Sequence, residues 1–306
     1  MADVSKSKLP PPSNEPFKAS IVWSNVIIFI FLHTGALYGL LIVGELQLYS
    51  FLFAMVYAFL GGLGTTAGAH RLWTHRSYRA TKPLRFALMI FNSIAMQNSI
   101  YVWARDHRVH HKHTETSADP HNSRRGFFFA HMGWLLLKKH PDVAKYGKEI
   151  DLSDLENDRI VMLQNRHYVK FGLFFSLILP TVLPVALLGE SAWNAYFSVG
   201  MLRYAFSLHS TWLVNSAAHM WGMRPYDVNI NPRENYLVSW LAIGEGFHNY
   251  HHSFPYDYRT SEFGPSPLNI TTCFIDICVW LGLASHCRRP TQEMIRRKKE
   301  KTGPPA

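Results

Sequence analysis

The sequence predicts an all-α integral membrane protein, with four transmembrane helices in two hairpins and a cytosolic helical cap. Three observations support this fold class. Charged residues make up 17% of the 306-residue chain, below the roughly 25% of a soluble domain. Two pairs of long apolar segments are each divided by a short polar break. The formal charge of +10 falls largely outside these segments.

The apolar segments have the length that a bilayer requires. Residues 21–69 contain no Lys or Arg and a single acid, Glu45, in the break Gly44–Leu46. The second pair is divided by Glu190–Ala192, which also lacks Lys and Arg. About 20 apolar residues suffice for a helix to cross the hydrocarbon core. The predicted spans are residues 21–43, 47–69, 171–189 and 193–218.

The distribution of basic residues predicts the orientation. Both hairpin breaks lack Lys and Arg, whereas the N-terminal segment, the long middle segment and Arg296–Lys301 are basic. Basic loops stay in the cytosol, so we expect both termini and the cap to be cytosolic. The charge then belongs to a membrane-facing and substrate-facing surface, and no nucleic-acid partner is expected. The predicted parts are a disordered tail (1–18), a membrane domain (19–289, with cap residues 70–170 and 219–289) and a basic tail (290–306).

Two segments depart from a simple span. Arg203 lies about ten residues into the fourth span, where a charge is costly. Either its side chain reaches the interface, or that helix begins later and protrudes into the cytosol. Leu268–Ser285 is apolar but contains Asp276. An amphipathic helix lying on the membrane fits the even number of spans better than a fifth span does.

Histidines gather at the predicted cytosolic ends of the spans. The chain has 17 histidines, and nine fall in the motifs "HRLWTH", "HRVHH", "NSAAH" and "HNYHH". All four motifs lie on the same side of the bilayer, which favours a shared metal site over solvated patches. The nine residues are His70, His75, His107, His110, His111, His219, His248, His251 and His252.

Helical geometry allows each motif to provide ligands. Residues at i, i+3 and i+4 share one helix face. Adjacent residues such as His110 and His111 are separated by about 100° around the axis, so one helix could serve two neighbouring metals. His70 and His75 are about 140° apart on an ideal helix. For both to meet one ion, the helix must end or loosen between them.

The ligand type favours transition metals. Neutral imidazoles suit Fe, Zn, Cu or Ni rather than Ca or Mg. A structural zinc site takes four ligands, typically with cysteine, whereas nine histidines suit two ions. Iron is favoured because it supports redox chemistry. A metal transporter would instead place ligands near the middle of the spans. Eight histidines lack cluster spacing and are left out of the site: His33, His113, His121, His131, His140, His167, His209 and His286.

With these motifs, the sequence resembles the membrane acyl-CoA desaturases, specifically the stearoyl-CoA (delta-9 type) family of animals. The resemblance runs from about Ile21 to Arg289. It implies a di-iron centre, two Fe²⁺ held by the nine histidines, with Asn215 acting through a water. Which histidine serves which iron stays open. The implied oxidoreductase reaction uses O₂ and two electrons to insert a cis double bond into a saturated fatty acyl-CoA at the endoplasmic reticulum membrane.

The resemblance also implies a partner and a substrate site. The chain has no "HPGG" haem motif, so a separate cytochrome b5 and its NADH-dependent reductase are expected to supply electrons. Trp212 resembles the residue at the bend of the acyl tunnel. Ala54 and Ala58 fall where the tunnel closes, and such small residues are expected to admit a longer or differently placed tail. The implied coenzyme A contacts are Asn25, Asn98, Arg105, Asp106, Lys138 and Lys139.

Related reactions remain as alternatives. Desaturation at position 11 or elsewhere, acyl hydroxylation, or desaturation of a lipid with another headgroup would use similar histidine motifs. The "WARDH" and "NSAAH" contexts favour an acyl-CoA substrate. Double-bond position and acyl chain length stay open.

Overall fold

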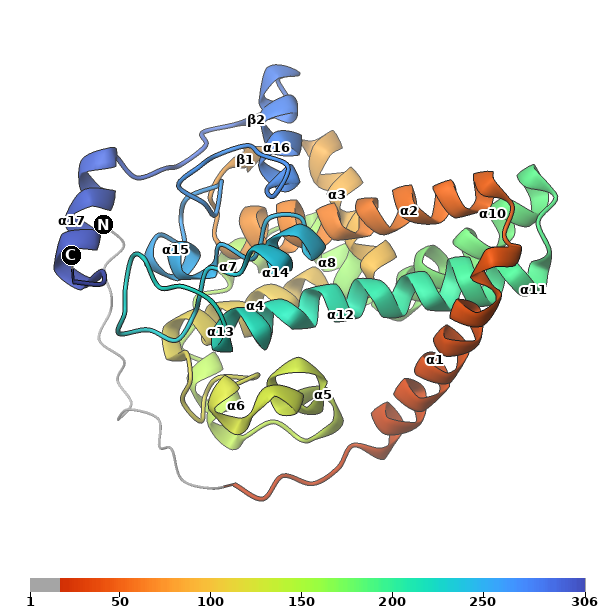
Figure 1. Ribbon diagram of the computed structural model, residues 1–306, viewed down its shortest axis with the longest axis horizontal. Helices are drawn as coiled ribbons and strands as arrows, with labels where there is room; N and C mark the ends of the chain where they lie inside the picture. The colour runs from red at the N-terminus through yellow and green to blue at the C-terminus, as the bar shows by residue number, and fades with distance from the viewer. Residues whose placement is uncertain (1–16, 306) are drawn as a thin grey trace.

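Long helices form the body of the protein (Figure 1). The structure, a computed structural model, describes residues 17–305. Within this part of the chain, three helices are long and apolar enough to cross a membrane, which confirms apolar helices at the first three predicted spans. They comprise α1 (Trp23–Ile42) with η1 (Val43–Glu45), α2 (Leu48–Leu63) with η2 (Gly64–Thr74), and α9 (Tyr168–Leu173) with η5 (Phe174–Ile178) and α10 (Leu179–Leu188). Since the second of these continues to Thr74, His70 lies inside the helix rather than beyond its end.

The fourth predicted span is also helical. It consists of α11 (Ala192–Asn194), η6 (Ala195–Leu202) and α12 (Arg203–Asn215). Arg203 is only 4% exposed. Its guanidinium donates hydrogen bonds to the Val199 carbonyl (3.1 Å) and the Ser176 hydroxyl (3.2 Å), and it lies 5.4 Å from the Tyr57 ring centroid. The expectation that the Arg203 side chain reaches the interface is therefore wrong, because contacts within the helix bundle hold its charge at a buried position.

Small residues let α1 approach η6 closely. Gly35 and Gly39 are spaced as in a GxxxG motif, which permits close backbone contact between membrane helices. A Cβ atom at Gly39 would lie 2.2 Å from the Phe197 carbonyl oxygen. The Ser198 hydroxyl donates to the Gly39 carbonyl at 3.0 Å. The first and fourth predicted spans are therefore held together backbone to backbone.

We expect Gly39→Ala to destabilise the protein by about 1–3 kcal/mol, the usual cost of overpacking. The added methyl group must push α1 away from η6. Gly44→Ala is the matched control, because a Cβ there meets no atom within 4 Å. Thermal unfolding in detergent checks this, and equal melting temperatures for the two variants would contradict it.

The two hairpin turns meet at the end of the bundle near α11 (Figure 1). The Gln47 backbone N–H donates to a Glu190 carboxylate oxygen at 2.9 Å, and its side-chain amide donates to the Gly189 carbonyl at 3.1 Å.

Most of the short helices gather toward the opposite end of the bundle (Figure 1). The helices outside the long bundle are α3 (Lys82–Ala95), α4 (Ile100–His113), η3 (Ser123–Arg125), η4 (Phe129–Gly133), α5 (Trp134–Leu136), α6 (Pro141–Gly147), α7 (Ser153–Glu156), α8 (Arg159–Arg166), α13 (Ala217–Met220), α14 (Tyr236–Leu241), α15 (His248–Ser253), α16 (Ile270–Trp280) and α17 (Gln292–Thr302).

One apolar cluster ties this region to the second long helix, through Ala67 and Leu72 of η2. Leu88 and Met89 of α3 pack with Ile100 of α4, Leu155 of α7 and Ile275 of α16, all at most 1% exposed. A two-stranded antiparallel pair, β1 (Arg79–Ala80) with β2 (Ala284–Ser285), joins the segment after η2 to the segment after α16. These contacts give η2 and α4 a fixed relative position.

The C-terminal segments are folded. Helix α16 has 11 residues, about 16 Å at 1.5 Å per residue, too short to cross a bilayer. The segment 290–306, expected as a basic tail, contains α17, where Ile295 is buried and Lys299 pairs with Glu262 at 2.7 Å. The predicted disordered tail lies almost wholly outside the described residues.

Candidate metal centre and adjoining cavities

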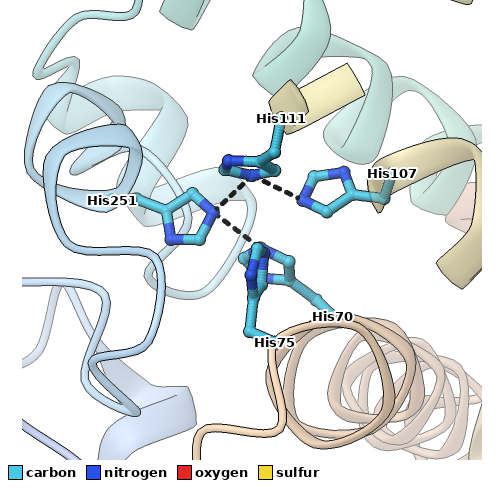
Figure 2. A group of neighbouring side chains, drawn as sticks. All are labelled: His70, His75, His107, His111 and His251. Carbon is cyan, nitrogen blue, oxygen red and sulfur yellow. Dashed lines mark hydrogen bonds between the residues drawn. The ribbon is translucent and has the colours of Figure 1, made fainter. Parts of the chain in front are cut away.

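The structure brings the nine predicted histidines together in two groups. In each group, the ring nitrogens that face inward all lie within 4.8 Å of one another. Figure 2 shows the first group, in which side chains from η2, α4 and α15 converge. The first group is His70, His75, His107, His111 and His251, and the second is His110, His219, His248 and His252.

A π-helix brings His70 and His75 together. The segment η2 is wound with one extra residue per hydrogen-bonded turn, and the His75 N–H donates to the His70 carbonyl at 3.1 Å. Residues five apart therefore lie on the same face of the π-helix, and the ring centroids of His70 and His75 are 4.8 Å apart. The sequence predicts that the helix must end or loosen between His70 and His75. The wider winding of the π-helix provides this change.

Two helices contribute to both groups. On α4, His107 and His111 point into the first group, whereas His110 points into the second. On α15, His251 joins the first group, and its neighbour His252 joins the second. The rotation of about 100° between adjacent helical residues produces this division.

The spacing of the nitrogens fits metal ligation. The Nε2 atom of His251 lies 3.0 Å from Nε2 of His70 and of His111, and Nε2 of His248 lies 2.9 Å from Nε2 of His219. Two nitrogens bound to one ion at about 2.1 Å, at right angles, are about 3.0 Å apart. The facing nitrogens of each group are thus spaced as ligands of a shared ion.

The imidazoles are in the form that binds metals. Burial, followed by the effect of neighbouring histidines, lowers the pKa of seven rings well below its ordinary value, so they are neutral at pH 7 and their lone pairs are free. The buried Nε2 of His75 has no hydrogen-bond partner among the described residues, as expected of a ligand atom. The seven are His75, His107, His110, His111, His248, His251 and His252.

Buried carboxylates orient three of the rings. The Nδ1 atom of His70 lies 2.8 Å from Glu245, that of His110 lies 2.9 Å from Asp119, and that of His219 lies 3.0 Å from Glu115. A carboxylate on the far nitrogen fixes the tautomer and raises the basicity of a ligating histidine. These three acids were not predicted from the sequence, where only their position near the histidine motifs points to them.

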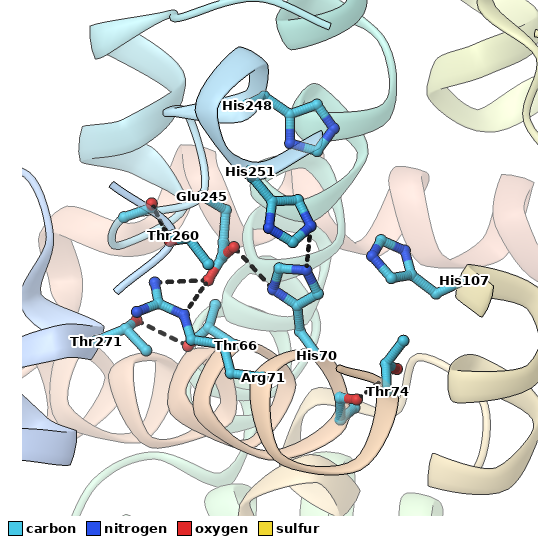
Figure 3. Close-up of polar contacts among 12 residues, drawn as sticks. Thr66, His70, Arg71, Thr74, His107, Glu245, His248, His251, Thr260 and Thr271 are labelled. Atoms are coloured by element: carbon cyan, nitrogen blue, oxygen red, sulfur yellow. Dashed lines mark hydrogen bonds and ion pairs between the residues drawn. The ribbon is translucent and has the colours of Figure 1, made fainter. Parts of the chain in front are cut away.

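An arginine fixes the carboxylate beside His70 (Figure 3). Arg71 Nη2 and Nε donate to one Glu245 oxygen at 2.9 and 3.0 Å, and the other oxygen meets His70. Burial alone would raise the pKa of Glu245, but Arg71 and His70 outweigh it and hold the pKa at about 2. Glu245 is therefore ionised throughout the physiological range.

The eight histidines left out of the predicted site have different positions. His121 packs against the second group, with its ring 4.3 Å from that of His110 and its Nδ1 3.6 Å from Asp119. These three residues form another set of donors able to hold an ion. His121 has no cluster spacing in the sequence, although it follows "HRVHH" in the segment "ADPH". The other seven lie outside both groups: His33, His113, His131, His140, His167, His209 and His286.

A mainly apolar cavity of about 290 Å³ adjoins both histidine groups. His70 and His107 line it from the first group, and His248 from the second. It extends between α2 and α12 to Ala58. Ala54 is buried but does not line it.

A second cavity, of about 210 Å³, shares a wall with the first. Trp103, His107, Thr211 and Asn215 line both. Gln97 lines the second cavity and donates to the Thr211 hydroxyl at 2.9 Å, a contact that the sequence analysis missed. Four residues predicted from the resemblance line this cavity: Asn25, Asn98, Asp106 and Trp212.

A third cavity, of about 410 Å³, is basic. Arg124, Arg125, Lys138 and Lys139 line it. Lys139 also pairs with Asp106, which connects this cavity to the wall of the second. Arg105 lines none of the three, and its guanidinium bonds the Asp106 carboxylate at 2.9 Å. Predicted headgroup contacts therefore lie in or next to the walls of two neighbouring cavities.

These features define a membrane-type helical protein with a histidine centre able to hold metal beside an apolar cavity. A family model described as fatty acid desaturase matches residues 46–261. The chain is 57% identical over 284 residues to acyl-CoA desaturase 1 of Tachysurus fulvidraco, covering 92% of this chain and 85% of that protein. It is 54% identical to stearoyl-CoA desaturase of Homo sapiens (94% and 79% covered) and 54% identical to acyl-CoA Delta12-desaturase of Acheta domesticus (94% and 81%). The chain belongs to the fatty acid desaturase family, which confirms the resemblance drawn from the motifs.

Proposed function

We propose that this protein inserts a cis double bond into a saturated fatty acyl-CoA, between carbons 9 and 10, with O₂ as oxidant. One observation carries the proposal: His70, His107 and His248, from both histidine groups, line the apolar cavity that extends to Ala58. An acyl chain in that cavity would pass the candidate metal centre. The reaction balances as one –CH₂–CH₂– unit, O₂, two electrons and two protons giving –CH=CH– and two waters.

The nine histidines would hold two Fe²⁺ ions, one in each group. When bound, the iron pair activates O₂ for removal of two hydrogens from an unactivated methylene pair. The protein's own contribution is orientation. Glu245, Asp119 and Glu115 fix three rings. Asn215, which lines the first two cavities, would act on one of the ions through a water.

Polar and basic side chains would bind the coenzyme A end. Lys138 and Lys139, with Arg124 and Arg125, line the basic cavity and suit its phosphates. The Asn25 amide nitrogen donates to the Leu135 carbonyl at 2.7 Å, which orients the side chain at the cavity wall, and its oxygen would accept from a ligand. Asn98, Arg105 and Asp106 complete the predicted headgroup contacts, and Trp212 lies where the chain would bend.

The membrane topology is inferred from the distribution of basic residues and from the helical segments α11, η6 and α12. We infer four spans, with residues 192–215 as the fourth because Arg203 is solvated within the bundle. Both termini would face the cytosol at the endoplasmic reticulum. A separate, acidic cytochrome b5 with its NADH-dependent reductase would then meet a basic cytosolic face.

A second candidate differs only in the double-bond position. The relative from Acheta domesticus named Delta12-desaturase is as similar to this chain, at 54%, as human stearoyl-CoA desaturase is. The same cavity with a shifted bend would give a product desaturated elsewhere. Expression in yeast lacking its own delta-9 desaturase, with mass spectrometry of derivatised fatty acids, distinguishes the two. A double bond between carbons 9 and 10 supports the proposal, and a double bond at another position supports the second candidate. No new double bond from iron-loaded protein contradicts both.

We expect Ala58→Trp to shift the preference toward shorter acyl chains. The indole would fill the part of the cavity between Met55 and Phe59. Ala54→Trp tests the other small residue, which lies outside the cavity wall. Competition between acyl-CoA substrates of different length checks both. A retained preference of Ala58→Trp for the longest chains would contradict this assignment.

A further inference from the structure

Three histidines outside the metal groups form a hydrogen-bonded chain. His33 on α1 meets His209 on α12, with 3.1 Å between their Nε2 atoms. The Nδ1 atom of His209 lies 2.9 Å from Nε2 of His131 in η4. The Nδ1 atom of His131 lies 3.0 Å from the Ser216 hydroxyl, next to Asn215. This histidine chain thus joins the first long helix, the helix that leads to the metal centre, and the π-helix η4 before α5.

The Phe29 end of the histidine chain determines the direction of the bonds. The Phe29 carbonyl can only accept, so His33 Nδ1 donates to it at 2.6 Å. With neutral rings, His209 Nε2 then donates to His33, and His131 Nε2 donates to His209. Burial and the neighbouring His209 lower the pKa of His131 to about 4, so this ring is neutral at pH 7. The Ser216 hydroxyl then donates to His131 Nδ1 at 3.0 Å, in place of the Trp212 carbonyl that lies 2.8 Å from the same oxygen.

These histidines surround Trp212. The indole ring lies 5.1 Å from His209, 5.7 Å from His131 and 6.4 Å from His33, the last nearly parallel to it. Phe29 closes the remaining side at 5.5 Å. Trp212 is 3% exposed and lines the second cavity beside Asn215. One part of the indole therefore faces the cavity, and the histidine chain supports the rest.

Other roles fit less well. Among the described residues, no set of donors able to hold an ion includes His33, His131 or His209. A proton path is disfavoured because the far end stops at the Phe29 carbonyl inside α1. Simple packing is disfavoured as well, since polar side chains in membrane spans are costly and apolar ones would fill the same space.

We propose that His33, His131 and His209 are positioning residues that fix the Trp212 indole and thereby determine which acyl carbons lie beside the metal centre. The proposal rests on the function proposed above. The histidine chain gives Trp212 a single orientation, because each of the three imidazole rings is held by two directed hydrogen bonds. Loss of one link frees the indole, and the bend of the bound acyl chain becomes less well defined.

The test compares His209→Phe and His33→Leu with the wild type, in purified protein with stearoyl-CoA, cytochrome b5, its reductase and NADH. Phenylalanine keeps a ring against Trp212 but breaks the chain, and leucine is favourable in a membrane span. We expect the fraction of minor positional isomers to rise about fivefold, within the range of coupling between contacting residues. We expect kcat to fall while KM and bound iron stay unchanged.

A double-mutant cycle separates positioning from general damage. In a Trp212→Phe background, His209→Phe should cause no further change in isomer distribution, because both act through one indole. His167→Phe is the matched control, because His167 is partly buried and lies outside the histidine chain. Unchanged isomer ratios and kcat in folded His33→Leu would overturn the proposal even if His209→Phe failed to fold. An inactive wild type would instead refute the proposed function.

Discussion

Replacing His251 with alanine should abolish desaturation. Its Nε2 lies 3.0 Å from those of both His70 and His111, so the change removes a ligand from the middle of the first group. Mutation of a residue that hydrogen-bonds a metal ligand usually costs about 10–100-fold in metal affinity or activity. We expect a larger loss of product here, because a ligand itself is removed. Metal analysis should show that one of the two ions is lost preferentially.

The adjacent residue provides the comparison. His252→Ala removes a ligand from the second group and should cause the same loss of product through the other ion. His167→Ala, outside both groups, is the control and should keep full activity and metal content. Gas chromatography of fatty acids and elemental analysis of the same preparations check all three. An active His251→Ala protein with full metal content would refute the assignment of the first group.

Glu245→Gln should weaken both the metal centre and the fold. The carboxylate holds His70 at 2.8 Å and pairs with Arg71, whose side chain is fully buried. Loss of a carboxylate behind a ligating histidine costs about 10–100-fold in metal affinity. Removing one partner of a buried ion pair costs about 3–5 kcal/mol. We expect both effects, because the Arg71 charge is left without its anion.

Glu293→Gln is the surface control for this change. Glu293 pairs with Arg296 and Arg297 on α17, where all three side chains are largely exposed, so its loss should be nearly neutral. Metal affinity comes from titration with a chelator, and stability from thermal unfolding of metal-free protein. If Glu245→Gln kept wild-type affinity and melting temperature, the orienting role of this carboxylate would be refuted.

Short-range patterns predict much of this protein. Three apolar helices are visible in the sequence because their composition alone satisfies a bilayer. The nine histidines could be selected because motif spacing reports helix faces directly. The need for a loosened helix between His70 and His75 also follows from spacing, since five residues do not complete whole α-helical turns.

Long-range contacts could not be predicted in the same way. Glu115 reaches His219 across 104 positions of sequence, and no local pattern connects them. Arg203 is expensive by any single-helix argument, and only the neighbouring Ser176 and Tyr57 explain it. The hydrogen bond between His33 and His209 joins residues 176 positions apart. In the sequence, each of these two histidines therefore resembles an isolated polar residue in a span.

The most direct test of the account is product analysis of purified, iron-loaded protein. It should be supplied with stearoyl-CoA, O₂, NADH, cytochrome b5 and its reductase. The proposed function predicts an acyl-CoA two hydrogens lighter, with one cis double bond between carbons 9 and 10 and no added oxygen. A hydroxylated product, or an unchanged substrate from protein carrying two irons, would contradict it.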